Sequence, residues 1–206
     1  MKDIKQYIGE ALKLGKGTRL KYHPQNKVEM QQLVQRLYDD KTNTCDLSMV
    51  DTSALTDVTY IFGKNLDIKE VNVTGWDVSN FKHFYKIFEG CNVLERIIGI
   101  ETWNVDASKL DYANLGFQYM FRFCRSLKSL DLSGWKMTGD SIALTGMFAD
   151  CVNLETVKGI DDWKITNSKR IRTLHNNMFN LCYKLKCNIS KWPNKPRTLT
   201  NKYIKY

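Results

Sequence analysis

The sequence predicts an α/β solenoid of stacked repeats, with a parallel sheet on one face and a helical cap at the N-terminal end. Three observations lead to this fold class. Five segments of the chain each begin near a Phe and close on a Trp. The aliphatic residues between these two aromatics alternate as they do in a short β-strand. Two stretches with helical spacing precede the first repeat. One such unit cannot bury its apolar face alone, so successive units must stack.

The five segments align on shared Phe, Cys, aliphatic and Trp positions. They are IFGKNLDIKEVNVTGW (61–76), IFEGCNVLERIIGIETW (87–103), MFRFCRSLKSLDLSGW (120–135), MFADCVNLETVKGIDDW (147–163) and MFNLCYKLKCNISKW (178–192). All five tryptophans close a segment, and four of the six cysteines follow the Phe by three residues: Cys91, Cys124, Cys151 and Cys182. Residues 46–53, DLSMVDTS, form a degenerate opening unit in which Val50 stands at the Trp position.

Within a unit the aliphatic residues follow L-x-x-L-x-L, as in Leu127, Leu130 and Leu132. This spacing predicts a short inward-facing strand that follows a turn carrying the Phe and the Cys. The residue after the first aliphatic alternates in charge along the repeats: Lys69, Glu95, Lys128, Glu155 and Lys186. In register these residues would form a strand-face ladder, in which each opposite-charge pair contributes ~0.2–1 kcal/mol.

The pattern MFxxC-x-x-L-x-x-L-D-L-S-x-W resembles the BspA-like leucine-rich repeat family, over about residues 46–192. The resemblance implies a leucine-rich-repeat solenoid that serves as a binding scaffold, and the best-known members are secreted or surface adhesins. The first residues carry charges at Lys2, Asp3 and Lys5 and lack the apolar run of an export signal. We therefore expect a short leaderless member, similar to phage or mobile-element proteins, in the cytoplasm of a bacterial cell.

Three regions follow from these patterns. Residues 1–45 are expected to form the helical cap, with helices over 2–13 and 26–38, or else a helix pair that docks a partner. Residues 46–192 hold about five repeats. Residues 193–206 form a basic tail in which Pro193 and Pro196 disfavour regular structure. This tail is a flexible segment, a C-terminal cap strand or a partner-binding arm.

No catalytic residue, metal ligand or cofactor is predicted. Zinc needs about four ligands that converge on one point, whereas one Cys per repeat forms a line. Without an export signal the cysteines are expected to be reduced, without disulfides, and to pack as small hydrophobes. The tryptophans are expected in the core rather than as a base-stacking platform. Four aromatics that do not fit the repeat are better candidates for contact residues: Tyr112, Tyr119, Phe123 and Tyr183.

Positive charge gathers near the C-terminus. The chain has a formal net charge of +9, and residues 164–206 carry eleven Lys and Arg and no acid. Such a block is either solvated or a surface for an anionic partner. The candidate partner-binding residues are Lys164, Lys169, Arg170, Arg172, Lys184, Lys186, Lys191, Arg197 and Lys202.

The predicted function is non-enzymatic macromolecular recognition by a monomer that does not span a membrane. The partner would be a host protein or ribonucleoprotein complex, bound as by an inhibitor or adaptor through the repeat face and the basic C-terminal end. One alternative is RNA binding through residues 164–206. Another is a surface adhesin or a structural component of a virion.

Overall fold

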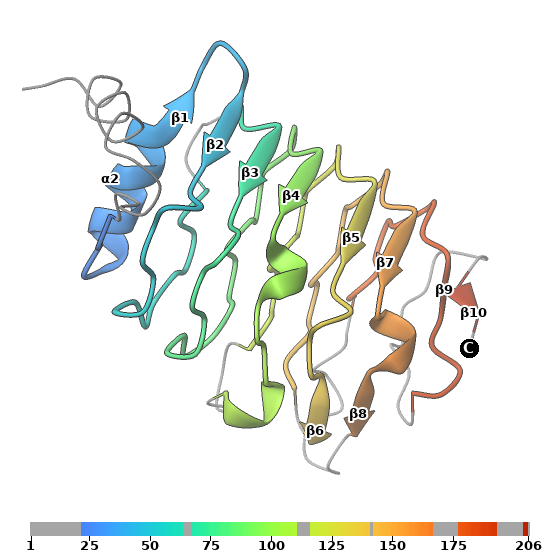
Figure 1. Ribbon diagram of the computed structural model, residues 1–206. Coiled ribbons are helices and arrows are strands. Elements are labelled where there is room, and N and C mark those ends of the chain that lie inside the picture. The colour runs from blue at the N-terminus through green and yellow to red at the C-terminus, as the bar shows by residue number, and fades with distance from the viewer. Residues whose placement is uncertain are drawn as a thin grey trace, which may run out of the picture.

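The computed structural model has a mixed α/β architecture with parallel strands and little helix (Figure 1). It describes residues 22–63, 67–110, 116–140, 142–166, 177–192 and 204–205. Strands from successive repeats lie side by side, and loops connect each strand to the next (Figure 1). Among the described residues, no helix combines the length and apolar character needed to cross a bilayer.

Helix α2 (Lys27–Leu37) confirms the second of the two expected helices. Asn26 caps its first turn, because the Asn26 side chain accepts a hydrogen bond from the Glu29 amide. The Glu29 carboxylate in turn accepts a hydrogen bond at 2.8 Å from the backbone amide of Gln25, the residue before the cap. Met30, Leu33 and Val34 are buried and belong to the same hydrophobic core as the repeats.

The strand of each repeat forms where L-x-x-L-x-L predicts it. The strands of this row are β2 (Thr44–Asp46), β3 (Glu70–Asn72), β4 (Arg96–Ile98), β5 (Ser129–Asp131), β7 (Thr156–Lys158) and β9 (Cys187–Asn188). The pairs β2–β3, β3–β4 and β5–β7 are parallel and in register. Their central residues point inward and are buried: Cys45, Val71, Ile97, Leu130, Val157 and Cys187. Cys45 and Cys187 therefore occupy strand positions rather than the position three residues after the Phe.

Two kinds of turn follow these strands. After β2, β3, β5 and β9 an Asp or Asn side chain accepts a hydrogen bond from the amide two residues on, as Asp131 does from Ser133 at 3.0 Å. After β4 and β7 the chain instead passes through Gly99 or Gly159, with φ of 87° and 88°, into a 3-10 helix. These helices are η1 (Ile100–Thr102) and η3 (Ile160–Asp162). Each Trp amide donates a hydrogen bond to the carbonyl of the residue three before it. The Val50 amide donates to the Leu47 carbonyl in the same way, which confirms Val50 at the Trp position.

A second row of parallel backbone pairing lies at or just after the Trp positions in the sequence. The parallel pair β6 (Thr138–Asp140) and β8 (Lys164–Thr166) lies here. The bridges Tyr22–Val50 and Asp106–Lys136 extend the row, and η2 (Ala107–Lys109) follows the second bridge.

The turns around each Phe form a third row. Alternate amides donate to the next repeat, as Phe121 does to Met147 and Phe123 does to Ala149, both at 2.9 Å. The amides between them close turns within the repeat, as Arg122 does to Tyr119. Each buried turn therefore satisfies its backbone groups without helix or strand.

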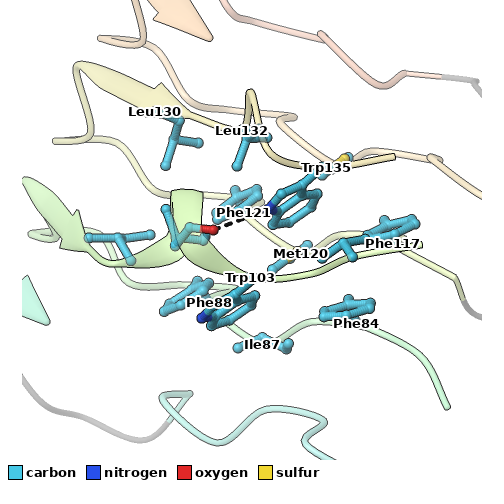
Figure 2. Packing of buried hydrophobic residues seen from close by; sticks show 14 of the residues in the cluster. Phe84, Ile87, Phe88, Trp103, Phe117, Met120, Phe121, Leu130, Leu132 and Trp135 are labelled. Atoms are coloured by element: carbon cyan, nitrogen blue, oxygen red, sulfur yellow. Dashed lines mark hydrogen bonds between the residues drawn. The ribbon is translucent and has the colours of Figure 1, made fainter. Parts of the chain in front are cut away.

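Two aromatic columns run through the core. The Phe rings of the five segments stack with interplanar angles of 8° or less, and Phe121 lies 5.5 Å from both Phe88 and Phe148. Trp76, Trp103 and Trp135 form the second column, as part of it is drawn in Figure 2. Trp135 also donates its Nε1 to the Ile100 carbonyl of the preceding repeat at 3.1 Å. The expected core role of both aromatic positions is confirmed by their burial.

The expected N-terminal helical cap is not supported by the structure. Residues 2–13, where the first helix is predicted, lie outside the described residues. The edge of the sheet next to β2 is covered by strand β1 (Tyr38–Asp39), which pairs antiparallel with β2 directly after α2. A strand can satisfy the open backbone groups of that edge, whereas the side of a helix cannot.

The basic tail contributes a strand at the other end of this row of strands, in a separate two-stranded sheet. Strand β10 (Ile204–Lys205) pairs parallel with β9, with Ile204 opposite Cys187. Of the possibilities open for the tail, a cap strand describes these two residues. Residues 193–203 lie outside the described residues.

Candidate functional site: an aromatic and cationic cluster on the turn row

The cysteine column has a structural role. Each thiol donates toward the carbonyl of the Phe one repeat earlier: Cys151 to Phe121 at 2.9 Å, and Cys182 to Phe148 at 2.9 Å. Cys124 donates in the same way to Phe88 at 3.2 Å. Burial raises the pKa of the Cys182 thiol to about 12 and that of Cys151 well above its ordinary value. These thiols donate hydrogen bonds between repeats, and only a protonated thiol can do so.

Thiol reactivity checks this assignment. At about pH 8 the reagent dithionitrobenzoate should label the six cysteines much more slowly in the native protein than in denaturant, because only a thiolate attacks the reagent. Burial raises the pKa of Cys45, Cys91 and Cys187 to about 12 as well, so they follow the same rule. The denatured protein, which should release six equivalents, is the control. Rapid native labelling of Cys124, Cys151 or Cys182, located by mass spectrometry, would contradict the assignment.

The strand-face ladder is in register within two groups, Lys69 with Glu95 and Lys128 with Glu155 and Lys186, but its side chains are not ion-paired with one another. The backbone amide of Glu95 donates to the Lys69 carbonyl, and the amide of Glu155 donates to the Lys128 carbonyl. The amide of Lys186 donates in the same way to the Glu155 carbonyl. The backbone therefore places these residues side by side. All five side chains are exposed. Among the described residues, the cross-strand ion pairs of this face lie elsewhere: Arg96 with Glu70, and Lys158 with Asp131 at 2.8 Å. The Asp131 carboxylate accepts hydrogen bonds from the Lys158 ammonium and the Ser133 hydroxyl, and these bonds lower its pKa to about 2.

The structure places part of the predicted basic surface. Lys164, Lys184, Lys186 and Lys191 are exposed, and Lys184 donates its Nζ to Asn153 at 2.8 Å. The other predicted residues, Lys169, Arg170, Arg172, Arg197 and Lys202, lie outside the described residues. The described members share an end of the molecule but form no common site.

Within the described part of the chain, no group of three or more His, Cys, Asp or Glu is placed to hold a metal ion.

A different surface gathers polar and aromatic groups. On the turn row, side chains from three successive repeats meet in a patch that we call the turn-face cluster. It contains four aromatic rings, three cations and one carboxylate: Tyr60, Tyr85, Lys86, Glu89, Tyr119, Arg122, Phe123 and Arg125. Tyr119 and Phe123 were among the predicted contact aromatics, and both are half-buried. Tyr183 is 52% exposed, and Tyr112 lies outside the described residues.

Glu89 is a buried carboxylate that pairs with two cations of the cluster. Its side chain is only 7% exposed, and it binds the Lys86 ammonium at 3.0 Å and the Arg122 guanidinium at 3.5 Å. A buried carboxylate requires such partners, because removing its charge from water is costly. Burial lowers the pKa of Lys86, but the hydrogen bond and the charge of Glu89 outweigh it, so the pKa is raised overall. The Lys86 ammonium is therefore fixed in place, whereas the Arg122 guanidinium is held more loosely.

The aromatic rings of the cluster are packed against these cations. The Lys86 ammonium lies 5.2–5.9 Å from the ring centres of Tyr60, Tyr85 and Tyr119. The Arg122 guanidinium lies 4.4 Å from the ring centre of Phe123, and that of Arg125 lies 5.5 Å from it. Cation–π contacts of this kind contribute about 0.5–1 kcal/mol each at exposed sites. The outer surface of the cluster thus presents ring edges and guanidinium groups rather than open ring faces.

The backbone under the cluster is strained. Wherever the structure describes them, the residues two before and two after the Phe of each segment have positive φ, the region that residues other than glycine avoid. At the cluster these positions hold Tyr60, Lys86, Tyr119 and Phe123, with φ of 56–63°. The other described positions of this kind hold residues that tolerate positive φ better, with Leu181 as the exception: Gly90, Gly146, Asp150 and Asn177.

Sequence reasoning missed most of this cluster. Its members stand at repeat positions that show no shared residue type, so an alignment of the repeats treats them as variable. One signal was present: Lys86 and Glu89 are three residues apart, and both differ from the residues at their repeat positions. The third repeat offers a second signal, because Tyr119, Arg122 and Phe123 surround a core Phe with bulky residues. The following repeat has small residues at these positions: Gly146, Ala149 and Asp150.

Comparison with known proteins identifies the repeats. The family described as "Mycoplasma protein of unknown function, DUF285" matches residues 21–116 and 115–204. The chain belongs to this family. DUF285 is found in BspA-like repeat proteins, which agrees with the repeated pattern. The two matched DUF285 stretches meet near residue 115, between β4 and β5, which are not paired as strands. No curated protein and no solved structure shows significant similarity to the chain.

Proposed function

We propose that this DUF285 protein is a non-enzymatic recognition scaffold that binds a macromolecular partner. The turn-face cluster is the observation that carries the proposal. Tyr and Arg are enriched in the residues that dominate binding energy at protein interfaces. Here the buried carboxylate of Glu89 binds Lys86 and Arg122, and the Tyr rings of the cluster pack against these cations. The thiols and tryptophans, which could have carried other chemistry, are engaged in the core.

We further propose that the repeats form a BspA-like leucine-rich-repeat solenoid. Three features support this fold. The L-x-x-L-x-L positions Leu127, Leu130 and Leu132 are buried, the strands pair parallel and in register, and the same side chains hydrogen-bond from repeat to repeat. A solenoid presents an extended surface assembled from equivalent positions of successive repeats, and the turn-face cluster is such a surface.

The proposed partner is a protein or ribonucleoprotein complex of a bacterial cell. The chain would act on it in the cytoplasm as a monomeric inhibitor or adaptor, such as a phage or mobile element encodes. The matched family, described from Mycoplasma, supports a bacterial setting. The free cysteines support a reducing compartment, because each column thiol donates a proton that a disulfide would remove. A surface adhesin or a virion component remains the competing proposal.

Affinity capture tests the function. The tagged full chain is expressed in a bacterial host, and captured proteins and nucleic acids are identified with and without RNase. A scaffold for one complex should retain the same complex at near-stoichiometric amounts in replicate captures. A variant of the chain with Phe121→Ala, whose fold should be weakened, serves as the negative control. Recovery of no reproducible partner, or location of the chain on the cell surface, would count against the proposal.

RNA binding through residues 164–206 is a second candidate, favoured by the exposure of Lys164, Lys184, Lys186 and Lys191. If about five cations meet phosphates, log K should fall with log salt at a slope of roughly −4. Charge reversal at Lys169, Arg170 and Arg172 should then abolish binding to an oligouridylate. Equal binding by the reversed variant and the wild type would remove this candidate.

A further inference from the structure

The turn-face cluster can be assigned to a class of partner. We propose that it binds an acidic segment of a protein partner, whose carboxylates contact Arg122 and Arg125 next to Phe123. This inference rests on the proposed recognition function and adds its contact surface and the chemistry of its partner. Neither the strand face nor the basic C-terminal residues are required for it.

Charge supports an anionic ligand. Of the three cations in the cluster, Lys86 is engaged by Glu89 at 3.0 Å, and Arg122 is only loosely engaged at 3.5 Å through one of its nitrogens. Arg125 is exposed, and its guanidinium lies 5.5 Å from the ring centre of Phe123. A stacked guanidinium keeps its N–H groups in the plane of the group, where they can donate to a carboxylate in a bidentate manner.

The ring faces argue against a nucleic acid at this site. Single-stranded nucleic acids bind through bases that stack on open aromatic faces. Here Phe123 has Arg122 and Arg125 over its ring, and Tyr119 has Lys86 and Arg122 within 5.5 Å of its centre. The Tyr119 ring also covers Gly146, where a Cβ would lie 2.6 Å from two of its carbons. A base could stack only after displacing these contacts.

The surroundings of the cluster fit an extended peptide. At the Tyr60 end a hollow of about 240 Å³ lies between α2 and the first turn, lined by Val28, Gln31, Gln32, Gln35, Tyr60 and Ile61. Val28 is 58% exposed in this hollow, and Gln31 donates to the Tyr60 carbonyl at 3.2 Å. The cluster therefore continues from cations into an uncharged hollow lined by an apolar side chain and amides. A protein segment offers both acidic and apolar side chains, whereas a phosphate backbone offers charge alone.

Backbone strain supports a functional role rather than a packing role. A non-glycine residue at positive φ costs about 1–2 kcal/mol, and bulky examples gather where function requires a side chain in a fixed place. In this protein four such residues lie in the cluster, at Tyr60, Lys86, Tyr119 and Phe123. The next repeat has Gly146 at the position equivalent to Tyr119, so the turn itself does not need a large residue.

The test compares two labelled probes of equal charge, a short oligoglutamate peptide and an oligouridylate, by fluorescence anisotropy at low salt. The variant is the full chain carrying Arg122→Gln and Arg125→Gln. The matched control carries Lys41→Gln and Lys136→Gln, which removes the same charge from two exposed residues that belong neither to the turn-face cluster, nor to the strand-face ladder, nor to the basic C-terminal residues. Circular dichroism confirms that both variants fold as the wild type does.

We expect the cluster variant to bind oligoglutamate about 10-fold more weakly or worse, the loss that follows removal of charge-assisted hydrogen bonds. The control should stay within about twofold of the wild type, since surface charges alone contribute little. Equal losses in both variants, or no binding of the peptide, would overturn the assignment. A loss of oligouridylate binding confined to the cluster variant would assign the site to nucleic acid instead.

The same variant separates this inference from the proposed function. If affinity capture recovers a partner and the cluster variant retains it, the cluster assignment fails while the recognition function stands. If the wild type captures nothing, the proposed function fails, and the probe measurement still decides whether the cluster selects an acidic peptide.

Discussion

Phe121→Ala is expected to lower the free energy of unfolding by about 3–5 kcal/mol, the usual loss when a buried Phe is truncated. Phe121 is completely buried at the centre of the Phe column, 5.5 Å from the rings on both sides. Because the ring stacks on two neighbouring rings at once, its removal leaves a gap on both sides within the column. The loss should therefore lie toward the upper part of that range.

Urea unfolding followed by tryptophan fluorescence measures this effect. Tyr183→Ala is the matched control, because Tyr183 is an aromatic residue of the next but one repeat with 52% of its surface exposed. That variant should stay within about 0.5 kcal/mol of the wild type. A Phe121→Ala variant as stable as the Tyr183→Ala variant would show that the column is not a principal source of stability.

Gly99→Ala should destabilise the protein more than Gly75→Ala, although the two glycines have similar φ of 87° and 80°. A Cβ on Gly99 would lie 2.4 Å from the Thr74 Cα and 2.5 Å from the Thr74 nitrogen. A Cβ on Gly75 would meet nothing within 4 Å. Gly75→Ala therefore reports the cost of positive φ alone, about 1–2 kcal/mol. Gly99→Ala adds the displacement of a neighbouring backbone, about 1–3 kcal/mol more.

The difference between the two variants measures how closely adjacent repeats approach. Gly159 repeats the geometry, with a Cβ that would lie 2.6 Å from the Ser133 Cα, so Gly159→Ala should match Gly99→Ala. The same urea titration serves for all three variants. Equal destabilisation by Gly99→Ala and Gly75→Ala would mean that the repeats can separate to admit a methyl group.

The parts of the fold that recur could be predicted from the sequence. The Phe, Trp and Cys columns, the inward strand positions and even Val50 at a Trp position follow from a pattern that every repeat restates. Repetition makes such positions visible, because each residue must match its neighbour in the stack as well as its own turn. The helix at Lys27–Leu37 was predictable for a different reason, since its cap and apolar spacing are local signals.

The features that occur once could not be predicted. The antiparallel strand β1 at the edge of the sheet is two residues long, and its pairing with β2 depends on contacts that no local pattern encodes. The charge ladder is in register, but its side chains are exposed and gain little from pairing in water. The ion pair between Lys158 and Asp131 forms instead, from the opposing last residues of paired strands.

The turn-face cluster depends on tertiary structure in the same way. Glu89 is a surface-type residue by sequence, and only the stacking of two repeats buries it between Lys86 and Arg122. The separation of Glu89 and Arg122 in the sequence is 33 residues. The aromatic residues Tyr119 and Phe123 could be selected because they break the repeat, but the reason they lie together could not.

The residues with positive φ that flank each Phe link the stability of this protein to the identity of its surface. A consensus version of these repeats, with asparagine at every such position, would relieve strain and should fold more stably. The same change would remove Tyr60, Lys86, Tyr119 and Phe123 and leave a surface that looks alike from one repeat to the next. The four bulky residues therefore give the turn face its distinct surface and lower the stability of the repeats that carry them.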